Sequence, residues 1–233
     1  MLGSLITDIR DSEHHCTVYR SGEPSEIERW LATHGVNIES RSLPAGGPPP
    51  FIEIKVNDEF VGVIGIEAVE GLLEPPIVRP DERDGISEGY RALFEILEKT
   101  VITGMSRREL LAVSREIEDR AFRVGEGILR VSFQTLSLFE SQTDVYRALA
   151  TDTDLEIHIY GIEDWTPPAI EGITYHSEGA ERFEPYWALA YDGGPDSTQA
   201  CGLVAKELSD GYTGFWTSDS AIVEEIAAGL NTF

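Results

Sequence analysis

Short runs with strand and helix periodicity alternate along the whole 233-residue chain, and this alternation limits the fold more than any other feature. Residues 155–160, Leu-Glu-Ile-His-Ile-Tyr, place an apolar side chain at every second position, which is typical of a strand with one buried face. Leu110, Val113, Ile117 and Ala121 recur instead at helical spacing. A chain that interleaves the two patterns predicts an α/β (α+β) fold, with mixed β-sheets flanked by helices.

Residues 1–74 predict an N-terminal α/β segment. Its expected elements are a helix over 2–9, a strand over 16–19, a helix from Pro24 to Gly35, a strand over 36–43, a hairpin of 51–56 and 60–66, and a helical turn over 68–73. His14 and His15 are expected at the end of the first helix, where the helix dipole favours them as a cap rather than as metal ligands.

Residues 75–85, rich in proline and charge, predict a linker to a second domain over 86–233, with its core at about 106–231. Ser106 and Glu109 have the spacing of a capping box, and Gly125 is expected to end the helix that they start. The other expected elements are helices over 90–97 and 142–150, strands over 155–160, 173–176, 187–191, 202–206 and 212–217, and a last helix after Ser218 or Asp219. Residues 128–134 are expected to form a strand, with a helix as the alternative.

The two halves share an order of elements that suggests internal duplication of an α-β-α-β-β-β-α unit. The tripeptide Leu-Ala-Thr precedes a predicted strand in each half, at residues 31–33 and 149–151. Residues 62–71 also resemble the segment that begins at Gly214. Three-residue identities arise easily by chance, so chance similarity remains the alternative.

Acidic residues outnumber basic residues by 42 to 18, for a formal net charge of −24, and lysine occurs only at Lys55, Lys99 and Lys206. Such a charge repels itself in dilute buffer and is screened at molar salt, so we interpret the chain as salt-adapted, with an acidic mesophilic protein as the alternative. The densest basic cluster, from Arg107 to Arg123, is interrupted by carboxylates and is expected to be a solvated helix face. The charge therefore argues against a nucleic-acid partner.

The only two cysteines, Cys16 and Cys201, lie far apart in the sequence and argue against a disulfide framework. The N-terminus lacks the pattern of a signal peptide, and no stretch approaches the 18 apolar residues of a membrane span. These absences predict a cytoplasmic protein without a membrane partner.

The sequence carries no motif of a nucleotide-binding loop, a zinc protease or a serine hydrolase, so no catalytic residue is predicted. Glu116 and Asp119, three residues apart on a helix, are the carboxylate pair that a hydrolase would use, although pairing with neighbouring arginines explains them better. Asp152, Asp154 and Glu156 lack the glycine of a calcium loop, and His158 is expected to be an ordinary strand histidine. No metal site is predicted, and the cofactor is unknown.

Aromatic residues concentrate in the last third of the chain, where tyrosine and tryptophan often line small-molecule pockets. We take Tyr160, Trp165, Trp187 and Phe215 as candidate ligand-binding residues, with core packing as the alternative for most of them. Trp165 stands apart because it lies in a loop stiffened by Pro167 and Pro168, directly after a strand.

Several motifs in order resemble the DICT family, whose sensory domains occur with diguanylate cyclases and two-component signalling proteins. They are Ser-Arg-Glu-Ile-Glu-Asp-Arg-Ala at 114–121, Phe133-Gln134, Tyr-Arg-Ala-Leu-Ala at 146–150, residues 155–161, and Phe-Trp-Thr-Ser-Asp at 215–219. The resemblance covers just over half the chain and implies an α/β or α+β fold with a ligand-linked or light-linked input. On the matching positions, the candidate sensing residues are Glu118, Asp119, Phe133, Gln134, Tyr146 and Arg147, with a buried Glu118–Arg147 ion pair as the structural alternative.

The resemblance implies a non-enzymatic sensory module that binds a small ligand and acts through a partner such as a histidine kinase or a regulator. The alternatives are a ligand-free regulatory adaptor and, less favoured, the hydrolase using Glu116 and Asp119. A homodimer is among the open oligomeric states.

The charge excess predicts salt-dependent stability. We expect the far-ultraviolet circular dichroism of the protein to show loosening when KCl is lowered from about 2 M to about 50 mM, because carboxylate repulsion is then unscreened. A fully folded protein with an unchanged melting temperature at the lower concentration would contradict salt adaptation.

Overall fold

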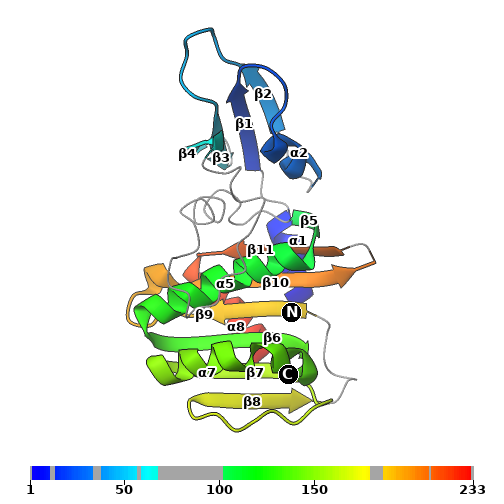
Figure 1. The fold of residues 1–233 in the computed structure, drawn as a ribbon, viewed down its shortest axis with the longest axis vertical. Coiled ribbons are helices and arrows are strands. Elements are labelled where there is room, and N and C mark those ends of the chain that lie inside the picture. Colours follow the sequence, from blue (N-terminus) through cyan, green and yellow to red (C-terminus); the bar gives the residue numbers. More distant parts are fainter. Residues whose placement is uncertain are drawn as a thin grey trace.

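The computed structural model describes residues 2–10, 14–33, 38–56, 59–67, 102–178, 186–209 and 211–231. They form a four-stranded sheet and a seven-stranded sheet, each mixed in strand direction and accompanied by helices (Figure 1). The predicted α+β class is therefore confirmed. The expected linker at 75–85 and the helical segments at 68–73 and 90–97 lie outside the described residues.

The four-stranded sheet has the order β2-β1-β3-β4. Its elements are β1 (His14–Arg20), α2 (Glu26–Thr33), β2 (Ile38–Ser42), β3 (Phe51–Val56) and β4 (Glu59–Gly65). Cys16, Val18, Ile52 and Ile54 alternate along β1 and β3 and are buried, together with Ile27 and Leu31 of α2. The alternation of side chains along a strand thus gives this small sheet one apolar face, which α2 helps to cover.

The prediction for His14 and His15 was wrong. The first helix, α1 (Leu2–Arg10), ends before them, and both residues belong to β1, where they pair with Val56 and Lys55 of β3. Strand pairing decides their conformation, because β3 supplies hydrogen bonds that a helix end does not offer.

The seven-stranded sheet has the order β5-β11-β10-β9-β6-β7-β8. Its strands are β5 (Ile102–Met105), β6 (Glu126–Thr135), β7 (Asp154–Ile162), β8 (Ile173–Glu178), β9 (Tyr186–Tyr191), β10 (Cys201–Leu208) and β11 (Gly211–Thr217). β6, β7 and β8 run parallel, and the other pairings are antiparallel. The longer helices are α5 (Arg107–Val124), α7 (Thr143–Asp152) and α8 (Ser220–Leu230), and α6 (Leu136–Phe139) is a single turn.

Helix α5 begins and ends as the sequence predicts. The Ser106 hydroxyl accepts a hydrogen bond from the Glu109 backbone amide, and the Glu109 carboxylate accepts one from the Ser106 amide. Gly125 ends the helix in the left-handed conformation at φ 78°, which glycine adopts without steric cost. The last helix, α8, is capped by Asp219 rather than by Ser218.

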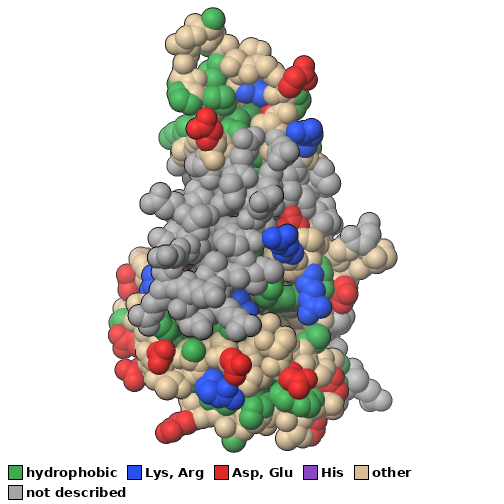
Figure 2. Space-filling model, viewed as in Figure 1, with side chains coloured by type: hydrophobic (Ala, Val, Ile, Leu, Met, Phe, Trp, Pro, Cys, Tyr) green, Lys and Arg blue, Asp and Glu red, His purple; other side chains and the backbone are tan. Residues whose placement is uncertain are grey.

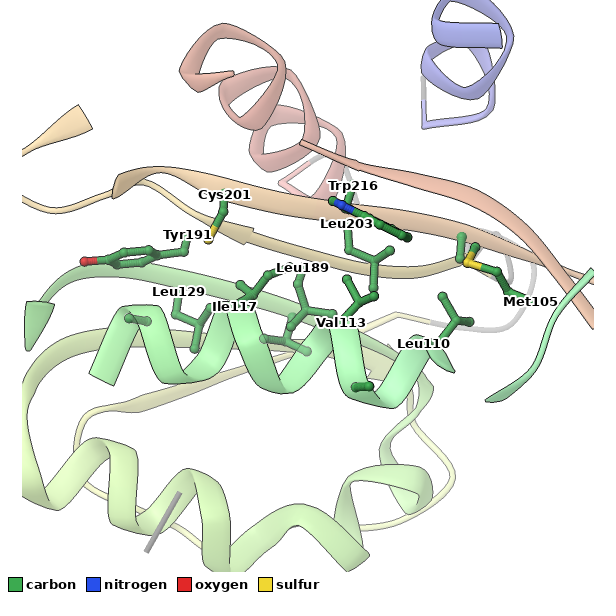
Figure 3. Packing of buried hydrophobic residues seen from close by; sticks show 14 of the residues in the cluster. Met105, Leu110, Val113, Ile117, Leu129, Leu189, Tyr191, Cys201, Leu203 and Trp216 are labelled. Carbon is green, nitrogen blue, oxygen red and sulfur yellow. The ribbon is translucent and has the colours of Figure 1, made fainter. Parts of the chain in front are cut away.

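The two faces of the seven-stranded sheet have separate apolar cores. On one face, α5 packs Leu110, Val113 and Ile117 against the strands, and Figure 3 shows these side chains between the helix and the strands that carry Leu129, Leu189 and Leu203. On the other face, α8 buries Val223, Ile226 and Leu230, and α1 buries Leu2, Leu5 and Ile6 in the same core. Helix α1 therefore belongs to the core of this sheet, although it precedes the four-stranded sheet in the chain.

The pairing patterns of the two sheets resemble each other. In the small sheet, β1 pairs with β2 in parallel and with β3 in antiparallel orientation. In the large sheet, β6 likewise pairs with β7 in parallel and with β9 in antiparallel orientation. The antiparallel pair β3–β4 then corresponds to the antiparallel pair β9–β10. The Leu-Ala-Thr tripeptides both lie near the end of the crossover helix, α2 or α7. The other expected correspondence fails, because by pairing order β4 corresponds to β10 rather than to the Gly214 strand, β11. The duplication itself stays a prediction.

Charged side chains mark the visible surface. Acidic side chains are spread over the part of Figure 2 where the seven-stranded sheet and its helices lie, with a few basic side chains among them. Cys16 and Cys201 are both free and buried, and among the described residues no helix is long and apolar enough to cross a membrane.

Candidate functional site

A cavity of about 260 Å³ lies where α5, the end of β6 and the start of α7 meet over the seven-stranded sheet. Helix α5 contributes Leu111, Ser114, Arg115 and Glu118 to its lining, and Arg107 stands at its first turn. The remaining lining comes from β6 (Val131, Ser132, Phe133, Gln134), the α6–α7 segment (Leu138, Ser141, Gln142, Tyr146) and β9 to β11 (Trp187, Leu189, Glu207, Tyr212). Ligands of open α/β sheets commonly bind in such a crevice at the carboxyl end of a strand.

A buried polar network forms one wall of this pocket. Arg115 donates through Nη1 to Glu118 and through Nη2 to the side-chain oxygen of Gln142. The Tyr146 hydroxyl donates to Glu118 Oε1 over 2.6 Å. Arg115, Glu118 and Tyr146 are 7%, 3% and 0% exposed, so the ion pair stands in a medium where charges interact strongly. The network therefore ties α5 to the first half of α7 and to the residue that precedes it.

The protonation of this network follows from its burial. Burial, followed by the negative charge of Glu118, raises the pKa of Tyr146 well above 10, so the phenol keeps its proton and donates. Burial is the largest effect on Arg115 and lowers its pKa, but the charge of Glu118, Tyr146 and the hydrogen bond to Glu118 together outweigh it, so the net pKa is raised. Arg115 Nε is buried without a hydrogen-bond partner among the described residues. One donor of the guanidinium is thus left unsatisfied beside the pocket.

The end of β6 is irregular where it reaches the pocket. The β6–β7 register shifts between Ser132 and Thr135, and Gln134 adopts φ 61°. Among the described residues, Gln134 is the one non-glycine residue with positive φ. For an ordinary L-residue the left-handed conformation costs about 1–2 kcal/mol. Bulges and strained residues of this kind concentrate at functional sites, where they redirect side chains.

Aromatic rings form the apolar part of the lining. Phe133 and Tyr146 pack edge-to-face with centroids 5.6 Å apart, and Phe139 lies behind both rings. Trp187 packs edge-to-face on Tyr212 at 6.2 Å, and its Nε1 donates to Ser114 Oγ over 3.0 Å. Edge-to-face pairs and a hydrogen bond at the polar tip hold these rings in one orientation.

The structure brings five of the ten predicted site residues together in this pocket: Glu118, Phe133, Gln134, Tyr146 and Trp187. They come from α5, β6, α7 and β9, which are distant in sequence. The predicted alternative of a Glu118–Arg147 ion pair is not formed, because Glu118 pairs with Arg115 while the partly exposed Arg147 pairs with Asp144.

The other five predicted residues lie elsewhere. Asp119 pairs with Arg123, and Arg147 lies with Asp144 on α7. Trp165 is partly buried against the α5-side core, whereas Tyr160 and Phe215 are buried in the core under α8 on the opposite face. The structure does not place these side chains in the lining of the pocket, and their part in ligand binding is an untested prediction.

Sequence reasoning missed Arg115, Leu111, Ser114 and Gln142, which also line the pocket. Arg115 was expected on a solvated helix face, and this was wrong, because it is buried. Arg120 and Arg123 do form the expected i,i+4 pairs, with Glu116 and Asp119. The sequence did carry a signal for Arg115, because it lies close to the apolar stripe of the helix and three residues before Glu118. The stripe alone, however, does not show how much of the helix surface beside it is buried.

Glu116 and Asp119, the carboxylates of the hydrolase alternative, both lie near Arg123. The distance from Glu116 Oε1 to Arg123 Nη2 is 3.6 Å, and Arg120 Nη2 is 3.9 Å away. Neither carboxylate lines the pocket. Close to this cluster, burial raises the pKa of the Cys201 thiol to about 12, so that thiol is not a nucleophile at neutral pH.

A second titratable cluster lies near the β8 edge of the seven-stranded sheet. His158 Nδ1 and His176 Nε2 are 2.8 Å apart, and His158 Nε2 is 2.8 Å from Glu156 Oε1. The His176 ring stacks on Tyr160 at 4.5 Å. Burial, then the neighbouring His158 and Arg130, lower the pKa of His176, which favours the neutral ring. Among the described residues no three histidine, cysteine or carboxylate side chains are grouped to hold a metal ion.

The comparison with protein families agrees with the motifs found in the sequence. Residues 92–208 match the model of DICT, described as the sensory domain in diguanylate cyclases and two-component systems, and they make up half of the chain. The chain belongs to the DICT family. The match starts before the expected core at 106 and ends before the motif at 215–219. Much of the pocket, from Arg107 to Glu207, lies inside the matched segment.

The other comparisons add little. The search of curated proteins finds no match. Among solved structures, the crystal structure of polyphosphate kinase from Porphyromonas gingivalis is similar at 12% identity and a TM-score of 0.40. The alignment covers 99% of this chain and 48% of the kinase chain. The chain thus spans about half of that structure, and a likeness at this TM-score carries no argument about fold or activity.

The buried network predicts unequal effects of removing two tyrosine hydroxyls. Tyr146→Phe leaves a buried carboxylate oxygen of Glu118 without its donor, and we expect it to lower the free energy of unfolding by about 2–3 kcal/mol. Tyr175→Phe is the control, because that partly exposed hydroxyl donates to the Pro168 carbonyl, and we expect a loss below about 1 kcal/mol. Urea unfolding in molar KCl measures both, and equal losses would contradict the importance of the network.

The strain at Gln134 predicts an unusual order of stability. Gln134→Gly and Gln134→Ala both remove the side chain, but only glycine relieves the positive φ, so we expect the glycine variant to be more stable than the alanine variant by about 1 kcal/mol. Glu224, an exposed residue in the interior of α8, serves as the control. There the alanine variant is expected to be the more stable by about 1 kcal/mol, because glycine is unfavourable inside a helix. The same order at both positions in urea unfolding would show that Gln134 is unstrained.

Proposed function

We propose that this DICT domain is a sensory module that binds a small ligand in the pocket between α5 and the α6–α7 segment, and that it signals through a partner protein. Membership of the family supports the sensory role. The observation that supports ligand binding is the combination, in one cavity, of a buried ion pair, a strained Gln134 and fixed aromatic rings. Features of this kind lower the stability of the fold, and in proteins they concentrate at functional sites rather than in ordinary packing.

The proposed route of the signal is the hydrogen-bonded connection between helices. Arg115 and Glu118 on α5 contact Gln142 and Tyr146 across the pocket, so a ligand that competes for any of these groups changes how α5 sits against the α6–α7 segment. Packed helices respond to such local changes by moving between discrete arrangements, because closely packed interfaces do not deform continuously. The proposed recipient is a signalling protein such as a histidine kinase or a regulator, and the protein itself is proposed to be non-enzymatic.

The test is the mass spectrometry of small molecules released from protein purified natively in molar KCl. We expect the wild-type protein to release a ligand at near-stoichiometric amount. Leu111→Trp is expected to release none, because the new indole ring occupies the cavity that Leu111 lines. Leu208→Trp is the matched control, since it adds the same ring at an exposed position of β10 outside the lining, and it is expected to retain the ligand.

Two results would contradict the proposal. A ligand held equally by Leu111→Trp and wild type binds somewhere other than this pocket. The second result is a wild-type protein that contains no ligand, together with equal binding of a signalling partner by wild type and by Leu111→Trp. That result favours the ligand-free adaptor instead. Circular dichroism of each variant in molar KCl checks that the substitution leaves the fold intact.

A further inference from the structure

The two outer strands of the four-stranded sheet differ in charge. These strands are β2 and β4, on opposite sides of the sheet (Figure 1). On β2, Glu39 and Arg41 form an exposed ion pair. Residues 60–65 of β4, Phe-Val-Gly-Val-Ile-Gly, contain no charged residue, in a chain that has 42 acidic ones. Charged side chains on an outer strand discourage pairing with another chain, so β2 is protected in this way and β4 is not.

Strand β4 also exposes apolar side chains on one face. Four large hydrophobic side chains are exposed in the described part of the chain, and two of them lie on β4, Phe60 at 62% and Val63 at 54%. They pair with Lys55 and Glu53, which alternate with the buried residues of β3 and so face away from the core of this sheet. The register shift between Ile54 and Lys55 explains why two β4 residues three apart share this face.

The larger sheet shows what covers the corresponding strand. By pairing order, β10 corresponds to β4, and β11 pairs with the outer edge of β10 in antiparallel orientation. Among the described residues no strand pairs with the outer edge of β4. An unpaired edge presents a row of backbone amides and carbonyls to which another strand can add. The fold itself therefore indicates an antiparallel strand as the occupant of this edge.

A second copy of β4 fits this edge. Residues directly opposite each other in an antiparallel pair have their side chains on the same face. When two β4 strands pair about a two-fold axis between Val61 and Gly62, Phe60 of each copy lies opposite Val63 of the other. This axis is close to the middle of the strand, Glu59–Gly65, so almost the whole strand is paired. The contact is then self-complementary, as a two-fold dimer requires.

The distribution of charge permits this contact between two copies of an acidic chain. Residues 14–66 contain four basic residues, at 20, 29, 41 and 55, and seven acidic residues, at 23, 26, 28, 39, 53, 58 and 59, for a net charge of −3 out of −24. Next to β4, Lys55 and Glu53 neutralise each other in an ion pair. Molar salt shortens the range of the remaining repulsion to about 3 Å. The apolar edge is therefore free of strong repulsion from its own copy.

We propose that the chain forms a two-fold dimer in which β4 pairs in antiparallel orientation with β4 of a second copy. This pairing joins the two four-stranded sheets into one continuous sheet. The observations that support it are the uncharged edge, the exposed Phe60 and Val63, and the strand that covers the corresponding edge of the larger sheet. The dimer does not depend on the ligand pocket, which lies on the seven-stranded sheet.

Sedimentation equilibrium of the full chain in molar KCl tests the dimer. We expect wild type to form a reversible dimer. Val63→Lys and Phe60→Lys each place a charge at the paired edge and are expected to raise the dissociation constant at least about ten-fold. Leu208→Lys is the matched control, because it introduces the same charge at an exposed aliphatic residue of another strand, and it is expected to leave the dimer unchanged.

Cross-linking through introduced cysteines tests the register. An equimolar mixture of Phe60→Cys and Val63→Cys is expected to form a disulfide-linked dimer under mild oxidation, because these positions lie opposite each other. Either variant alone is expected to form far less, because identical positions are then about 10 Å or more apart, beyond the reach of a disulfide. The native Cys16 and Cys201 are buried and contribute little background.

Three results would overturn the proposal. Wild type that stays monomeric in molar KCl at about 100 µM forms no such dimer. A dimer that both lysine variants leave intact, or that Leu208→Lys weakens equally, forms through another surface. Cross-linking of either cysteine variant alone as efficiently as the mixture contradicts the register. Circular dichroism in molar KCl checks the fold of each variant, and the cross-linking, which adds no charge, tests the same contact if a lysine variant unfolds.

Discussion

The pocket depends on the ion pair between Arg115 and Glu118, because this pair places charge on the side of α5 that packs toward the sheet and the α6–α7 segment. Removing two charged groups from water costs several kcal/mol each, and their attraction offsets this cost only with good geometry and further hydrogen bonds. Gln142 and Tyr146 supply those hydrogen bonds. The helix pair is thus held at the spacing that these polar contacts require, and the cavity lies beside them.

Helix α5 serves two purposes through adjacent stripes of its surface. Leu110, Val113, Ile117 and Ala121 are buried in the core against the sheet. Ser114 and Glu118 each directly follow a residue of this stripe, Arg115 directly follows Ser114, and all three line the pocket. Because the apolar stripe fixes the rotation of the helix, the polar stripe has little freedom to move away from β6 and β9. The stability of the core and the geometry of the site are therefore coupled in one element.

Much of the secondary structure follows from local patterns. The capping box at Ser106, the glycine that ends α5, and the alternation along β7 each depend on neighbouring residues, and all three are found as predicted. His14 and His15 were misplaced because their conformation depends on pairing with Val56 and Lys55 of β3, far away in the chain. The family motifs identified the sensory domain and included Glu118, Phe133, Gln134 and Tyr146 of the pocket lining.

The sequence by itself determined the alternation of strands and helices, the ends of α5 and the family. Only the tertiary structure decided which aromatic residues meet. Along β9 and β11, Trp187 and Tyr212 face the α5 side, whereas Phe215 faces α8, and on β7 the Tyr160 ring is likewise buried with α8. A period of two residues assigns side chains to alternate faces but does not say which helix covers which face. That choice is made when α5 and α8 dock on opposite sides of the sheet, so the site exists only after long-range packing is complete.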